Sequence, residues 1–260
     1  MQMFQFDLSK KINGIFYYTN PAHQNFDEDT YLSIREKEGR LYPDRIVKNL
    51  PLIASDHPLK REWLIRKKSI DKLLSYFSKL NGKIFLEIGC GNGWLSNRVA
   101  SNTKNVVAGL DLNQHELIQA ARVFGANENL YFVYGNIYEN IFPAEIFDVI
   151  FFSSSIQYFP NLMEIICRAF YFLKPDGEIH IIDSFFYDGV ELQKAAERTS
   201  KYFNKLGFPS AANYYFHRSW NELKTFNYKV VNKNNLSFQK ILKTFTGINR
   251  IIFPWIIIKK

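Results

Sequence analysis

The segment Glu87-Ile88-Gly89-Cys90-Gly91-Asn92-Gly93 carries three glycines at alternate positions. It follows a short apolar run and precedes a segment with helical periodicity. Glycine has no side chain, so the backbone at such positions can turn tightly and approach a ligand closely. A glycine turn between a strand and a helix therefore indicates a site for a nucleotide-like cofactor.

A second residue supports this interpretation. Asp111 lies 22 residues after Gly89, at the end of the next apolar run, where an aspartate can accept hydrogen bonds from ribose hydroxyls. The dinucleotide fingerprint would also need a glycine at position 94, which is Trp94 here. This disfavours NAD and FAD. S-adenosylmethionine (SAM) has no pyrophosphate and needs less contact with a helix N-terminus, so it remains compatible.

The middle of the chain alternates between apolar runs and helical patterns. Each apolar run is hydrophobic along its length, which is typical of strands in a parallel sheet covered on both faces. A Pro/Gly breaker, Lys174-Pro175-Asp176-Gly177, ends the last of these helices. The expected strands are 83–89, 105–111, 130–134, 147–152 and 178–184, and the expected helices are 94–100, 114–124 and 162–173.

The two ends of the chain extend this unit. An aromatic insert at about 185–220 is expected to be helical around 190–206, and strands at 226–231 and 250–258 form an antiparallel pair that closes the sheet. Residues 1–81 form an N-terminal helical or lid region, with an amphipathic helix over 63–80. Residues 82–260 then form the cofactor-binding domain.

These motifs resemble class I SAM-dependent methyltransferases, in particular the small-molecule branch of methyltransferase type 11 and the ubiquinone/menaquinone C-methyltransferases. The segment 87–93 is similar to the family's first motif, and Gly109-Leu110-Asp111 to its ribose-binding strand end. Phe147-Asp148-Val149-Ile150 resembles the start of its fourth strand, and 173–178 the turn into its fifth. The resemblance implies an α/β, Rossmann-like, mostly parallel seven-stranded sheet with helices on both faces and an antiparallel C-terminal strand.

The resemblance also implies how SAM is held. The glycine turn would lie along the methionyl part, with Glu87 near its amino group and Asp111 on the ribose. Asn136 stands where the family often has an acid for the adenine amino group. The simpler alternatives are that Asp111 caps the following helix, that Glu87 is solvated, and that Gly135-Asn136 is an ordinary turn. The implied cofactor-binding residues are Glu87, Gly89, Cys90, Gly91, Gly93, Asp111, Leu112, Asn136, Ile137, Ser153 and Ser154.

Methyl transfer from a sulfonium is an in-line displacement, so the protein must align the acceptor, exclude water and sometimes remove a proton. No metal is needed. The candidate catalytic residues are His217, Tyr158 and Asp183, each of which has a structural role as its alternative. Aromatic residues of the insert could form an apolar acceptor pocket or simply belong to the core.

Several classes of methyltransferase do not fit. Ser153-Ser154-Ser155-Ile156 is not the Asp/Asn-Pro-Pro-aromatic motif of enzymes that methylate amino groups of DNA bases. Neither cysteine lies where a pyrimidine-C5 enzyme has its nucleophile, and no acidic cluster follows the fourth strand as in metal-dependent catechol enzymes. The sequence thus favours a metal-independent enzyme with a small-molecule acceptor. A nicotinamide-dependent oxidoreductase, a non-catalytic SAM-binding scaffold and an RNA methyltransferase remain as alternatives.

The charge distribution underlies the RNA alternative. The chain has 260 residues and a net charge of +8, but residues 201–260 hold eleven Lys or Arg against the single acid Glu222, giving +10. Such a tail could attract an anionic substrate, lipid head groups or nucleic acid, but a solvated Lys/Asn-rich surface is the favoured explanation and nucleic acid is not the expected partner. The N-terminus has no signal-peptide pattern, no run reaches the roughly 18 apolar residues of a membrane span, and there are two cysteines. We expect a cytoplasmic protein.

Overall fold

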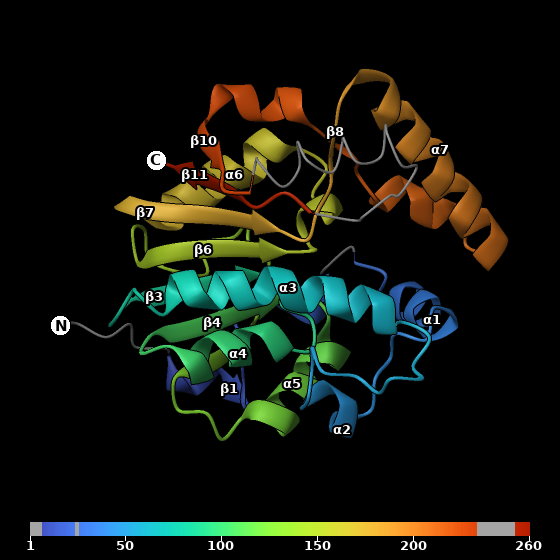
Figure 1. Cartoon of the computed structure of the whole chain (residues 1–260). Helices are drawn as coiled ribbons and strands as arrows, with labels where there is room; N and C mark the ends of the chain where they lie inside the picture. The colour runs from blue at the N-terminus through green and yellow to red at the C-terminus, as the bar shows by residue number, and fades with distance from the viewer. Residues whose placement is uncertain (1–6, 24–25, 233–252) are drawn as a thin grey trace.

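The computed structural model describes residues 7–23, 26–232 and 253–260. The chain forms an α/β fold built around one large sheet (Figure 1). The polar segment 234–246 and the first residues of the strand predicted at 250–258 lie outside the described residues.

The centre of the sheet is parallel, as the sequence predicts. Five strands pair in the order β5-β4-β3-β6-β7, and all of their mutual pairings are parallel. Because these strands are parallel, their carboxyl ends lie at one edge, and the strand order reverses beside β3, where open α/β sheets bind ligands. The strands are β3 (Ile84–Ile88), β4 (Val106–Asp111), β5 (Leu130–Tyr134), β6 (Phe147–Ser153) and β7 (Leu173–Ile182).

The antiparallel end of the sheet is also confirmed. β11 (Ile256–Lys259) pairs antiparallel with β7 on one side and with β10 (Asn227–Val230) on the other. The short η5 (Trp220–Thr225) precedes β10.

The predicted number of strands, seven, is wrong, because the described residues form a sheet of nine. β1 (Lys11–Ile12) and β2 (Ile15–Tyr17) come from the N-terminal region, and β2 pairs parallel with β5. Strands of two and three residues are too short to show an alternating pattern in the sequence. η1 (Leu8–Lys10) and η2 (Pro21–His23) flank this hairpin.

The breaker before the fifth central strand acts differently from the prediction. α6 (Leu162–Phe172) ends as expected, but β7 begins at once and passes through Pro175 and Gly177. Phe147 pairs with Leu173 and Val149 with Glu178, so the breaker residues between them leave the regular ladder. Proline lacks the N–H that a ladder needs, which explains why the irregularity falls here.

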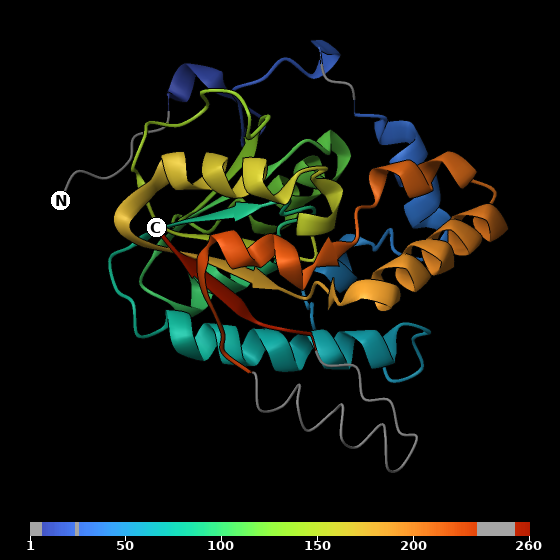
Figure 2. The same ribbon diagram turned by 90° about the horizontal axis from the view of Figure 1, so that it is seen from above.

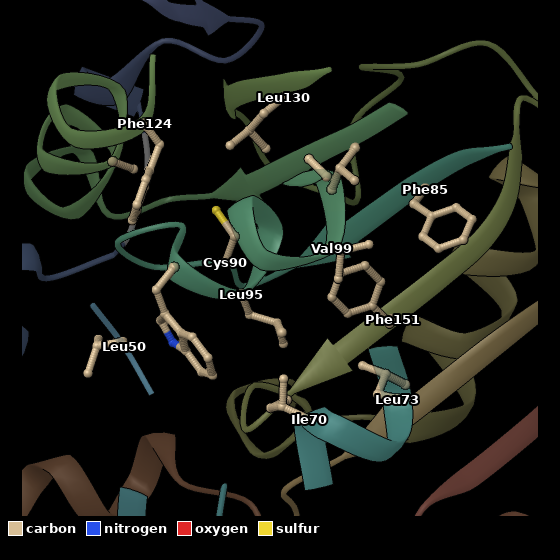
Figure 3. Close-up of a cluster of buried hydrophobic side chains, with 14 of the residues drawn as sticks. Leu50, Ile70, Leu73, Phe85, Cys90, Leu95, Val99, Phe124, Leu130 and Phe151 are labelled. Atoms are coloured by element: carbon tan, nitrogen blue, oxygen red, sulfur yellow. The ribbon is translucent and has the colours of Figure 1, made fainter. Parts of the chain in front are cut away.

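Helices cover both faces of the sheet. Alternate residues of β3 show this directly, because Phe85 joins one buried cluster while Leu86 joins the other. Figure 3 shows the cluster on the first face, in which α3 and α4 pack on Phe85 and Phe151. The helices of this face are α3 (Lys60–Phe77), α4 (Trp94–Asn102) and α5 (Gln114–Phe124), while α6 covers the other face.

The N-terminal region and the insert meet at the carboxyl ends of the strands (Figures 1 and 2). Lys37 Nζ donates to the Leu206 carbonyl at 3.0 Å, and the Tyr202 hydroxyl donates to Glu38 at 2.6 Å. These contacts join α1 to α7 above the sheet edge. The elements are α1 (Glu28–Lys37), α2 (Asp44–Val47), η3 (Ile156–Tyr158), β8 (Phe186–Tyr187), α7 (Gly189–Leu206), η4 (Pro209–Tyr214) and β9 (Arg218–Ser219).

Candidate functional site

A cavity of about 1120 Å³ lies at the carboxyl edge of the parallel strands. Its walls come from the segments after β3, β4, β5, β6 and β7, from α1 and the first turns of α3, and from α7 and η4. Ligand sites usually occupy roughly 300 to 1,000 Å³. The cavity is therefore large enough for a cofactor and a second molecule.

The glycine turn forms the floor of the cavity beside β4. The backbone N–H groups of Gly89 and Cys90 donate to the Leu110 carbonyl at 2.8 and 3.1 Å. Gly89 has φ +74°, and a Cβ added to it would lie 2.5 Å from the Ser155 Cβ. The Ser155 hydroxyl in turn donates to the Ile88 carbonyl at 2.6 Å. Only glycine fits this close approach of two strand ends.

Two residues of the turn, Cys90 and Gly93, pack mainly against the hydrophobic core. Cys90 lines the cavity, but its side chain is 5% exposed and belongs to the buried cluster of Figure 3. Burial raises the pKa of its thiol well above the ordinary value, so the thiol stays protonated at neutral pH. Gly93 does not line the cavity and lies against the ring of Phe132.

Asp111 reaches from the end of β4 to the glycine turn. One carboxylate oxygen accepts the Gly91 N–H at 2.6 Å, and the other accepts the Asn113 N–H at 2.8 Å. Burial raises the pKa of this carboxyl group. Asp111 does not cap α5, because Asn113 is the N-cap and accepts the Glu116 N–H at 2.9 Å. Leu112 lines the cavity next to it.

Glu87 lies at the end of β3 and is buried, with 2% of its surface exposed. Its carboxylate accepts a hydrogen bond from the Ser96 hydroxyl of α4. Burial raises its pKa to about 8, with a further contribution from the charge of Asp111. A cation that binds beside this carboxyl group would lower its pKa and favour the ionised form.

The segment after β5 is held by the N-terminal region. Asn136 donates its backbone N–H to the Thr19 hydroxyl at 2.9 Å, and its side-chain oxygen accepts the Tyr138 N–H at 3.0 Å. Asn136 and Ile137 both line the cavity.

Ser153 and Ser154 line the cavity at the end of β6. The hydroxyl oxygen of Ser153 is buried without a hydrogen-bond partner in the described part of the chain. Ser154 has φ +57°, a conformation that non-glycine residues adopt at an energetic cost and that often occurs at ligand sites.

The three candidate catalytic residues all line the cavity. His217 is half-buried, its Nε2 has no hydrogen-bond partner among the described residues, and burial together with the charges of two arginines lowers its pKa. Burial raises the pKa of Tyr158, which therefore stays a phenol. Asp183 has a fully buried side chain and lies 3.6 Å from Arg66 Nε, and burial raises its pKa as well.

The cavity also contains charged residues that the sequence motifs did not single out. Glu116, in the first turn of α5, is 7% exposed, and burial raises its pKa to about 7. A Cβ on Gly91 would lie 3.0 Å from its carboxylate. Arg35, Arg40 and Arg66 reach the cavity from the N-terminal region. Glu116 stands three residues after the N-cap Asn113, a spacing that could have drawn attention to it.

Among the described residues, no group of three His, Cys, Asp or Glu side chains is arranged to hold a metal ion. Within the same residues, no helix is both long enough and apolar enough to cross a membrane.

Residues 86–181 match the model of a family described as a methyltransferase domain. The chain is 28% identical to 27-O-demethylrifamycin SV methyltransferase of Amycolatopsis mediterranei over 62% of its length, and 32% identical to malonyl-[acyl-carrier protein] O-methyltransferase 2 of Ilyobacter polytropus over 45%. It spans about half the length of each of these relatives, 50% and 45%. The structure of geranyl diphosphate C-methyltransferase from Streptomyces coelicolor superposes with a TM-score of 0.53 at 14% identity, covering 90% of this chain and 98% of the other.

Proposed function

We propose that this chain, which belongs to the class I SAM-dependent methyltransferases, binds SAM in the cavity and transfers its methyl group to a small-molecule acceptor. One observation carries this proposal. Asp111, the glycine turn, Ser153 and Asp183 follow one another along the edge formed by β4, β3, β6 and β7, and all of these segments face one cavity.

The residues present fit SAM. The Gly89 turn leaves a cradle that any side chain would fill, and buried polar atoms without partners in the described chain, Ser153 Oγ and Asn92 Oδ1, face this region. SAM carries an ammonium group and a sulfonium, and the carboxyl groups of Glu87, Asp111 and Glu116 offset positive charge. When bound, SAM supplies an electrophilic methyl group.

The family resemblance supplies the roles of these residues, and the order of the segments along the edge supports them. Asp111 accepts hydrogen bonds from the ribose hydroxyls, and Glu87 accepts from the methionyl amino group. Asn136 and Ile137 contact the adenine, with Leu112 between them and the ribose. Cys90, Gly91 and Gly93 shape the turn, and Ser153 and Ser154 lie beside the sulfonium.

On the acceptor side, His217 is the group best suited to remove a proton. A lowered pKa keeps it neutral at pH 7, and Nε2 is available to accept a hydrogen bond. Tyr158 stays protonated and donates to the acceptor instead. Asp183 is a second candidate base. Variants of these residues that lose turnover but keep SAM affinity would identify the catalytic group.

The acceptor half favours an organic molecule of moderate size. Aromatic rings surround it, with Tyr158 and Tyr215 5.9 Å apart and Tyr215 and His217 5.2 Å apart between ring centroids. The relatives named above act on a rifamycin, a malonyl carrier protein and geranyl diphosphate. Such rings provide apolar surface together with hydroxyl donors.

Calorimetry with SAM, S-adenosylhomocysteine and NAD(H) tests the cofactor, followed by transfer of labelled methyl groups to small-molecule extracts and to RNA. We expect SAM binding and a labelled small-molecule product. Binding of NAD(H) but not SAM would overturn the proposal in favour of an oxidoreductase. SAM binding without any labelled product would indicate a non-catalytic SAM-binding scaffold. Labelling of RNA alone would contradict a small-molecule acceptor.

Asp111→Ala should weaken SAM binding by roughly 1 to 3 kcal/mol, because ribose hydroxyls and two backbone N–H groups lose their acceptor. Titration calorimetry measures the effect. Asp111→Asn keeps one acceptor oxygen and should lie between wild type and the alanine variant. Asp71→Ala removes an exposed carboxylate of α3 and should leave affinity unchanged. Unchanged affinity in a folded Asp111→Ala variant would rule out the ribose role.

A further inference from the structure

Arg66 is a cavity residue that no motif identifies. It lies on α3, one helical turn after Trp63, and its side chain is 14% exposed. The guanidinium carbon lies 5.1 Å from the centroid of the Trp63 ring, and Trp63 packs edge-on against Trp94 at 5.3 Å. Since Trp94 is the first residue of α4, Arg66 is fixed beside the helix that follows the glycine turn.

The charged neighbours of Arg66 place it near the expected methionyl end of SAM. Both Arg66 and Glu87 line the cavity, and the positive charge of Arg66 opposes the upward shift that burial imposes on the pKa of Glu87. On its other side, Nε lies 3.6 Å from the Asp183 carboxylate, which is longer than a hydrogen bond. Burial raises the pKa of Asp183, and Arg66 and the Ser69 hydroxyl both lower it, although neither Asp183 oxygen has a hydrogen bond of ordinary geometry within the described residues.

The other arginines of the cavity differ from Arg66. Arg40 forms two hydrogen bonds with Glu62, at 2.7 and 2.6 Å, and Arg35 contacts Glu38 at 3.2 Å. Arg198 lies on α7, next to Tyr187 and His217 of the insert. Arg66 differs because its carboxylate partner, Asp183, lies 3.6 Å away and because it lines the same cavity as Glu87.

We propose that Arg66 binds the α-carboxylate of SAM, while Glu87 holds the adjacent amino group. This inference rests on the proposed function and adds the residue that recognises the negative end of the cofactor. The methionyl end of SAM is a zwitterion, and a carboxylate that enters a partly buried site needs a cation to offset its desolvation. The planar fork of arginine matches a carboxylate with two parallel hydrogen bonds.

Asp183 then acts as a positioning residue for Arg66, and this role replaces that of second candidate base. Its carboxylate is fully buried at the end of β7, and its φ of +53° turns the residue away from the regular strand. From there it faces Nε, and the two terminal nitrogens of the guanidinium would bind the carboxylate of SAM. Trp63 supports the flat face of the same group.

The test compares two ligands that differ only in this carboxylate, SAM and decarboxylated SAM. Titration calorimetry at pH 6.5, where the amino groups of both are protonated, gives their affinities for the full chain. We expect wild type to prefer SAM by roughly 10- to 150-fold, the range of charged hydrogen bonds. Arg66→Gln should lose that preference by binding SAM more weakly, while its affinity for decarboxylated SAM stays the same.

Two further variants complete the design. Arg61→Gln removes an exposed arginine of the same helix and should keep the full preference for SAM. Arg66→Lys keeps the charge without the fork, should lie between wild type and Arg66→Gln, and serves if the glutamine variant does not fold. Equal affinity of wild type for both ligands, or an undiminished preference in either Arg66 variant, would overturn the inference and leave the proposed function intact. Failure of wild type to bind either ligand would instead overturn the proposed function.

Discussion

Gly93→Ala is expected to lower the free energy of unfolding by about 2 to 5 kcal/mol, from backbone strain and overpacking together. Gly93 is the N-cap of α4 and has φ +70°, where an L-residue is strained. A Cβ at this position would lie 2.4 Å from a ring carbon of Phe132 and 3.0 Å from the Ala120 Cβ. Phe132 is 2% exposed in the middle of β5, so its ring has no free space into which it can move.

Gly39→Ala is the matched control. Gly39 has a similar φ, +66°, but a Cβ there would meet nothing within 4 Å. It therefore carries only the backbone strain, about 1 to 2 kcal/mol. Urea denaturation of the wild type and both variants separates the two contributions. Equal losses in the two variants would contradict the steric role assigned to Gly93.

The central part of the fold could be predicted because its signals are local. α5 and β5 begin and end at the predicted residues, Gln114–Phe124 and Leu130–Tyr134. A helical stripe of apolar residues, a capping residue and a buried apolar strand are each visible within a short window of sequence. The glycine turn and Asp111 were visible for the same reason, since their roles depend on position within a strand-turn-helix unit.

The remaining features depend on contacts between distant segments. The pairing of β2 with β5 joins residues more than a hundred positions apart, and neither β1 nor β2 is long enough to show a pattern. Arg66 and Glu116 lie on amphipathic helices, where a charged residue ordinarily faces solvent. Which side of α3 or α5 faces the cavity is decided only when the helices dock on the sheet.

Glu116→Gln is expected to raise the free energy of unfolding by about 3 kcal/mol at pH 8, since each pKa unit corresponds to about 1.4 kcal/mol. Burial raises the pKa of Glu116 from 4.5 to about 7 in the folded chain. A raised folded pKa means that the unfolded state ionises first, so stability falls as pH rises from about 4.5 to 7. Glutamine resembles the protonated carboxyl group and does not ionise, so the variant avoids this loss. Below pH 4.5 the wild type and Glu116→Gln should have the same free energy of unfolding, because the carboxyl group is then protonated in both states.

Urea denaturation at pH 5 and pH 8 measures the effect, with Glu128→Gln, an exposed position, as the control that should change neither value. If Glu116→Gln raised the free energy of unfolding equally at both pH values, packing would be the cause and the electrostatic explanation would be contradicted. The same experiment with SAM extends the argument to function. A cationic ligand favours the ionised carboxylate, so SAM should stabilise the wild type more than Glu116→Gln at pH 8. The carboxyl groups that weaken the ligand-free fold would then include those that offset the positive charge of the cofactor, which explains why Glu87, Asp111 and Glu116 line one cavity.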